Sequence, residues 1–127
     1  CKKYLLKSTN PSIVNVSSIA GIKGIGSSLA YASSKGALNT MTKSMARNLG
    51  PIRVNAACPG FIQGEWLRKG LGDEIYNTAL ANTQANTPLG LAVTPDEVAQ
   101  VIYGFIDLSK VVTGETYIVD GGYHLTI

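Results

Sequence analysis

The first half of this 127-residue sequence has no acidic residue. The charged residues among 1–64 are all lysines or arginines, whereas all 8 acidic residues lie at Glu65 or beyond. A basic surface of this kind can bind nucleic acid, but few aromatic residues are interspersed with the basic ones to stack on bases. We therefore expect no nucleic-acid partner. A bound anionic ligand, or an acidic surface outside these residues, would balance the charge.

Cysteines and long apolar runs are also scarce. The 2 cysteines, Cys1 and Cys58, are too few for a disulfide framework, which fits a reducing, cytoplasmic setting. No apolar run is long enough to span a bilayer, and the basic N-terminal stretch has too little apolar sequence for a signal peptide. We expect one domain, no membrane association and no bound metal.

Short apolar segments alternate with helical patterns along the chain. The segments 12–17 (SIVNVS) and 52–58 (IRVNAAC) are typical of buried strands, and a third strand is expected in GETYIVDGG at the C-terminal end. Strands separated by helices predict right-handed crossovers and a parallel sheet, so the fold class is α/β. The glycine-rich segment 18–28 predicts a loop, and residues 61–94, which lack a clean period, predict short helices in a cap.

Two helices have clear boundaries. The first is predicted from about Leu29 to Leu49, with Ser27 or Ser28 as its N-cap and a stop at Gly50-Pro51. The second is predicted over 94–108, because Thr94 can cap it, a proline follows, and two acidic residues suit the N-terminal dipole.

Tyr31 and Lys35 open the apolar stripe of the first helix. They share a narrow arc with Leu38, Thr42 and Met45, which should face the sheet. Lys35 is thus at a core position, and its charge also opposes the helix dipole. Lys35 could simply extend to solvent from the helix end. The alternative is a chemical use for the pair.

A phenol beside an ammonium group is a compact proton donor and acceptor. A free phenol is a poor base at neutral pH, but a neighbouring cation and a helix N-terminus both stabilise the phenolate. Ser18 directly follows the first strand, at the sheet edge where ligands bind in open parallel sheets. Its hydroxyl could hold a substrate oxygen beside the phenol, although an ordinary loop hydroxyl is the alternative.

Four segments resemble, in order and spacing, the second half of the short-chain dehydrogenase/reductase family. They are IVNVSS, YASSK, RVNAACPG and TGETYIVDGG. The sequence is most similar to the group that includes 3-oxoacyl-(acyl carrier protein) reductases. The resemblance implies the C-terminal half of a Rossmann-like, doubly wound parallel sheet, and an NAD- or NADP-dependent oxidoreductase. Its substrate would be a small carbonyl compound or secondary alcohol.

The resemblance also implies a role for each site residue. Tyr31 would be the general acid/base, Lys35 would stabilise its phenolate and bind the nicotinamide ribose, and Ser18 would hold the substrate oxygen. The neighbouring Ser17 is a weaker candidate. Tyr31 and Lys35 would share the cofactor site with the turn after the second strand, which contributes Pro59, Gly60 and Ile62.

The sequence departs from the family pattern at the cap and in its extent. Gly64 replaces a threonine that contacts the cofactor, and Leu91 replaces a common arginine. Trp66 is expected to pack the cap onto the sheet, with an apolar substrate wall as the alternative. The family's glycine-rich phosphate loop is absent, and GIKGIG at 21–26 does not replace it because no ribose-binding acid follows.

Residues 1–127 are therefore expected to form the C-terminal part of one dinucleotide-binding domain, with a substrate cap at about 61–94. Alone they are expected to be inactive and marginally stable. A homo-oligomer, dimer or tetramer, is expected through the Tyr31 helix and the last strand. A non-catalytic relative that acts as a binding or scaffold protein is a second hypothesis, and epimerisation or dehydration at the same site is a third.

Overall fold

A three-stranded parallel sheet forms the centre of the molecule. The computed structural model describes residues 1–127, with Leu108 described by its backbone alone. The strands β1 (Ser12–Val16), β2 (Arg53–Pro59) and β3 (Thr116–Val119) lie in the order β1-β2-β3, and both pairs are parallel. The predicted α/β class and its three parallel strands are confirmed.

The central strand β2 is the core of the sheet, and every residue in it is buried. Val54 and Cys58 are completely inaccessible, as is Asn55, which joins β2 to the segment before β3. The Asn55 side chain donates to the Val112 carbonyl (2.9 Å) and accepts from the Glu115 backbone (3.0 Å). A polar side chain is tolerated here because its hydrogen-bonding groups are paired.

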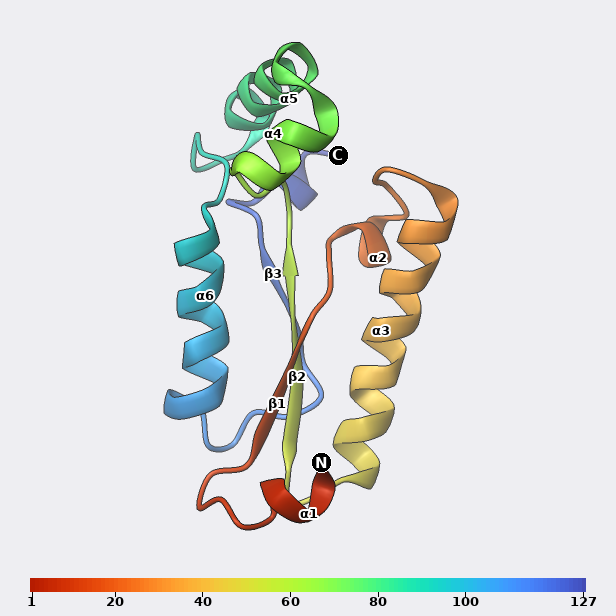
Figure 1. Cartoon of the computed structure of the whole chain (residues 1–127), viewed down its shortest axis with the longest axis vertical. Helices are drawn as coiled ribbons and strands as arrows, with labels where there is room; N and C mark the ends of the chain where they lie inside the picture. Colours follow the sequence, from red (N-terminus) through yellow and green to blue (C-terminus); the bar gives the residue numbers. More distant parts are fainter.

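Helices cover both faces of this sheet (Figure 1). The long helix α3 (Leu29–Asn48) lies on one face. On the other face lies α6 (Pro95–Tyr103), which continues into the π-helical turn η1 (Gly104–Leu108). The short helix α1 (Lys2–Leu5) lies at the amino ends of the strands, and the turn η2 (Tyr123–Leu125) ends the chain at the opposite side. Within the described structure, none of the helices combines the length and the apolar character that crossing a bilayer requires.

The segment between β1 and α3 was predicted to be a loop, but it contains a short helix, α2 (Ala20–Lys23). This helix packs tightly against α3 at Gly21, where a Cβ atom would lie 2.4 Å from the Lys35 carbonyl carbon. It ends at Gly24, whose φ of 71° is in the left-handed region. Glycine has a low helix propensity, so the sequence gives no helical signal here. Packing against α3 fixes α2 instead.

Two helices lie beyond the carboxyl ends of the strands (Figure 1). They are α4 (Glu65–Leu71) and α5 (Asp73–Asn86), joined at Gly72. Helices were predicted here, but α5 is longer than expected for a segment without a clear period. Its only buried side chains are Tyr76 and Thr83, so it has no continuous apolar stripe for the sequence to show.

The start of α6 is a complete capping box. The Thr94 hydroxyl accepts the Glu97 backbone N–H at 3.3 Å, and the Glu97 carboxylate accepts the Thr94 backbone N–H at 2.7 Å. These bonds to Thr94 lower the pKa of Glu97 below its usual value. The predicted cap at Thr94 is confirmed, and Ser28 is the confirmed cap of α3.

Acid should weaken the start of α6. Because the folded-state pKa of Glu97 is lowered, its contribution to stability is present above the unfolded-state pKa and is lost as the pH falls through the folded value. We expect Glu97→Gln to lower the melting temperature at neutral pH, with a gap to wild type that closes in acid. Thermal unfolding at a series of pH values measures this gap. A gap that stays constant from neutral to acidic pH would contradict the role of the carboxylate.

Candidate functional site

The Tyr31 and Lys35 side chains lie together near the N-terminus of α3. The Ser28 hydroxyl caps this helix by accepting the Tyr31 backbone N–H at 3.1 Å. The Lys35 Nζ atom lies 5.6 Å from the centre of the Tyr31 ring and donates to the Val16 carbonyl at 2.9 Å. Lys35 therefore does not extend freely to solvent, because the end of β1 holds its ammonium group beside the phenol.

Ser18 follows β1 and is buried beside the turn that ends β2. Its hydroxyl accepts the Ala20 backbone N–H at 3.1 Å and makes only a long contact, 3.5 Å, to the Pro59 carbonyl. A bond of that length is weak, so the Ser18 proton can turn toward a bound oxygen. Ser17 is engaged instead in the fold, because its hydroxyl donates to the Lys35 carbonyl at 3.2 Å.

The turn after β2 joins the carboxyl ends of all three strands. The Pro59 carbonyl accepts from the Ile19 backbone, and the Gly60 N–H donates to Val119, both at 3.0 Å. Glycine is required at position 60, since a Cβ atom there would lie 2.7 Å from the Asp120 Cβ atom. Beyond it, Ile62 forms a bridge with Val93.

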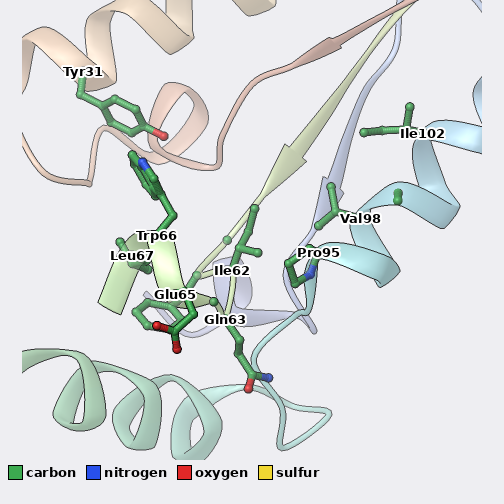
Figure 2. A pocket seen from close by; sticks show the side chains of 13 residues that line it. Tyr31, Ile62, Gln63, Glu65, Trp66, Leu67, Pro95, Val98 and Ile102 are labelled. Carbon is green, nitrogen blue, oxygen red and sulfur yellow. The ribbon is translucent and has the colours of Figure 1, made fainter. Parts of the chain in front are cut away.

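A cavity of about 550 Å³ opens between α3, this turn, α4 and α6, and we call it the Tyr31 cavity. Figure 2 shows the Tyr31 ring projecting from α3 into it, with Trp66 on the same side and Ile62 and Val98 across from them. The volume is sufficient for a small organic ligand or part of a cofactor.

Trp66 corrects one expectation. Its side chain is 86% exposed, so it does not pack the cap onto the sheet as predicted. Figure 2 shows it standing on α4 beside Tyr31, where it forms an apolar wall of the Tyr31 cavity. The indole is free to contact a ligand.

Charge is sparse around the Tyr31 cavity. Of the lining residues that the structure describes, Glu65 alone is charged, and Figure 2 shows its carboxylate directed toward α5 and away from Tyr31. The nearby Arg68 stacks 4.3 Å from the centre of the Tyr76 ring, and its hydrogen bond to Asp73 raises the pKa of the guanidinium. The cavity therefore suits an uncharged ring or chain.

Tyr76 is a site residue that the sequence did not reveal. Its hydroxyl accepts the Gly64 backbone N–H at 3.1 Å, and its ring packs against Phe61 with centres 5.6 Å apart. Tyr76 thus anchors α5 to the turn after β2 at the position where Gly64 departs from the family pattern. A lone tyrosine in a helix without a clear period carried no signal for this role.

Cys58 lies near the carboxyl end of β2 and does not line the Tyr31 cavity. It is completely buried, and burial raises the pKa of its thiol. Cys58 therefore acts as a small packing side chain of the core, and a thiol with a raised pKa is a poor nucleophile.

Comparisons with known proteins agree with this arrangement. Residues 1–124 match the family model described as enoyl-(acyl carrier protein) reductase. The chain is 44% identical over 122 residues to the 3-oxoacyl-[acyl-carrier-protein] reductase FabG of Thermotoga maritima, covering 94% of this chain and 48% of that protein. It is 37% identical to the short-chain dehydrogenase/reductase homolog YusR of Bacillus subtilis, covering 96% of this chain and 90% of YusR.

A solved structure shows the same fold. A small-chain dehydrogenase in complex with NADPH superposes with a TM-score of 0.85 at 29% identity, covering 93% of this chain and 53% of the other. The chain thus spans about half the length of this dehydrogenase and of the Thermotoga reductase, and nearly all of YusR.

Proposed function

We propose that this chain, which belongs to the short-chain dehydrogenase/reductase family, carries the proton-transfer site of an NAD(P)-dependent oxidoreductase. The reaction would move a hydride between a nicotinamide and a carbonyl compound or secondary alcohol. One observation carries the proposal: the Lys35 ammonium is fixed by the Val16 carbonyl beside a phenol that faces an open cavity.

The proton would move at the Tyr31 hydroxyl. In reduction, Ser18 donates a hydrogen bond to the substrate carbonyl oxygen, which polarises the carbonyl. The carbonyl carbon receives the hydride, and the oxygen takes the Tyr31 proton, so that an alcohol and a phenolate result. The Lys35 ammonium stabilises that phenolate until solvent returns the proton. Oxidation is the reverse of these steps.

The residues of the site fit a nicotinamide cofactor. When bound, the nicotinamide supplies or accepts the hydride. The apolar Tyr31 cavity suits the uncharged ring of the reduced nicotinamide, and Lys35 uses one of its three donors on Val16, which leaves donors for ribose hydroxyls. We propose Tyr31 and Lys35 as cofactor contacts, together with Pro59, Gly60 and Ile62. The NADPH complex of the similar dehydrogenase supports a nicotinamide cofactor, and either NAD or NADP fits this site.

We propose that residues 1–127 are the C-terminal part of one dinucleotide-binding domain, with residues 61–94 as the cap over the substrate. Among the described strands β1 pairs only with β2, so its outer edge can accept a further strand from the part of the domain that binds the phosphates. Without that part, we expect residues 1–127 to be inactive.

We also propose a homo-oligomeric assembly and a cytoplasmic location. Leu29 and Met41 on α3 are 86% and 47% exposed, which supports a homo-oligomer, dimer or tetramer, formed through this helix. Both cysteines are free thiols, which supports a reducing compartment such as the cytoplasm.

Turnover tests the proposed function. The protein in its full natural length should oxidise NADH or NADPH with at least one of a panel of ketones, and should reduce the oxidised cofactor with the matching alcohol. The control is Ser44→Ala, a change of the same kind as Ser18→Ala at an exposed site on α3. Ser44→Ala should keep full activity, whereas Ser18→Ala should lose most of it. Equal activity of the two variants, or no turnover with either cofactor, would contradict the proposal.

A further inference from the structure

We propose that a second cleft beside Ser18 holds the body of the substrate and selects uncharged ketones and alcohols that carry an additional hydroxyl group. This inference rests on the proposed function, since it assigns the substrate class of the same site. We call it the α5 cleft, because α5 contributes Ala79, Asn82 and Thr83 to its lining.

The α5 cleft adjoins the Tyr31 cavity. It has a volume of about 290 Å³ and includes Ser18, and the two spaces share Gly60 and Phe61 as lining residues. A carbonyl oxygen held by Ser18 would therefore lie at their junction, with the nicotinamide on the Tyr31 side. The remainder of the substrate would extend into the α5 cleft.

The walls of the α5 cleft combine apolar residues with polar residues that carry no charge. Ile25 and Phe61 supply apolar surface, whereas Asn82, Thr83 and Tyr123 carry polar groups. In the part of the chain that the structure describes, Asn82 Oδ1 accepts from Asn86, and no hydrogen bond involves the Asn82 amide nitrogen, the Thr83 hydroxyl or the Tyr123 hydroxyl. These groups are available to a ligand.

Tyr123 is held in the wall by the last residues of the chain. The buried Asp120 carboxylate accepts the backbone N–H groups of Gly122 (2.9 Å) and His124 (2.7 Å), and the His124 ring lies 2.9 Å from it. Thr126 then donates to the Asn86 carbonyl at 2.9 Å, which ties the C-terminal turn to α5. The cleft is therefore preorganised, so ligand binding does not have to order this wall.

The charge of the walls defines the substrate class. No lysine, arginine, aspartate or glutamate is among the described residues that line the α5 cleft. A carboxylate or phosphate placed against these walls would lose its hydration without gaining a counter-ion, which is costly. A hydroxyl group would instead find donors and acceptors. The volume equals that of roughly ten liquid water molecules, so a body of about that many non-hydrogen atoms fits.

A matched series of methyl ketones tests the inference in the protein of full natural length. The series comprises hexanone, hydroxypentanone, in which a hydroxyl replaces the terminal methyl group, and levulinate, which ends in a carboxylate. We expect kcat/KM for hydroxypentanone to exceed that for hexanone by about tenfold, the value of one net hydrogen bond. Levulinate should be the poorest substrate.

Thr83→Val and Tyr123→Phe should each bring the ratio of kcat/KM for hydroxypentanone to kcat/KM for hexanone close to one. Both changes keep the size of the side chain. Thr78→Val, at an exposed position of the same helix that does not line the cleft, should leave the ratio unchanged. A ratio that neither variant alters, or levulinate as the best substrate, would overturn the inference while leaving the proposed function intact. No reduction of any of the three ketones would count against both.

Discussion

Replacing Tyr31 with phenylalanine should lower kcat by about a hundred- to ten-thousand-fold, the usual contribution of a positioned general acid or base. The variant removes the hydroxyl of the ring whose centre lies 5.6 Å from the Lys35 ammonium and which lines the Tyr31 cavity. The phenylalanine ring keeps the contact of the Tyr31 ring with Gly26, in the segment that joins α2 to α3. Steady-state kinetics with either nicotinamide cofactor measures the loss.

Tyr103→Phe is the matched control for this experiment. Tyr103 is exposed on α6, and its hydroxyl donates to Asp107 at 3.0 Å, away from the cavity. This variant should retain the wild-type rate. Similar kinetics for the two variants would show that the Tyr31 hydroxyl is not the proton donor.

Gly21→Ala should lower the free energy of unfolding by about 1–3 kcal/mol, the usual cost of overpacking. The new Cβ atom would lie 2.4 Å from the carbonyl carbon of Lys35 and 2.5 Å from the nitrogen of Gly36. Both are backbone atoms of α3, so no side chain can move aside. Helix α2 would have to shift away from α3, and this would also displace Ser18 relative to Lys35. Activity should fall together with stability.

Gly70→Ala provides the comparison for a glycine that makes no contact. It lies within α4, and a Cβ atom there would have no heavy atom within 4 Å. Because alanine restricts the unfolded chain more than glycine does, this variant should be neutral or more stable by up to about 1 kcal/mol. Denaturant unfolding of both variants measures the difference. If Gly21→Ala proves as stable as Gly70→Ala, the close packing of α2 on α3 would be contradicted.

Most of the fold could be predicted because its signals are local. The β-branched run at the first strand, the Ser28 cap and the Thr94 capping box each depend on neighbouring residues alone. Boundaries shifted by a residue or two, as with β2, which begins at Arg53 and ends at Pro59. Helices α2 and α5 were the difficult elements, since contacts with other parts of the chain fix them.

The candidate site also has features that the sequence predicts and features that only the tertiary structure determines. The spacing of Tyr31 and Lys35 on one helix predicts that they are neighbours, and the ring-to-ammonium distance of 5.6 Å agrees. That Val16 would hold the ammonium, or that Tyr76 would anchor Gly64, depends on the tertiary structure. The exposure of Trp66 could not be predicted either, because the direction in which α4 leaves the sheet decides it.

The most direct test of hydride transfer at this site is isotopic. NADH or NADPH that carries deuterium at the transferable position of the nicotinamide is incubated with the protein of full natural length and a ketone that it reduces. We predict that the alcohol formed contains deuterium on its carbinol carbon, and that Tyr31→Phe lowers the rate of this transfer without changing its position. An alcohol without deuterium at that carbon, or undiminished transfer by the variant, would contradict the proposed reaction.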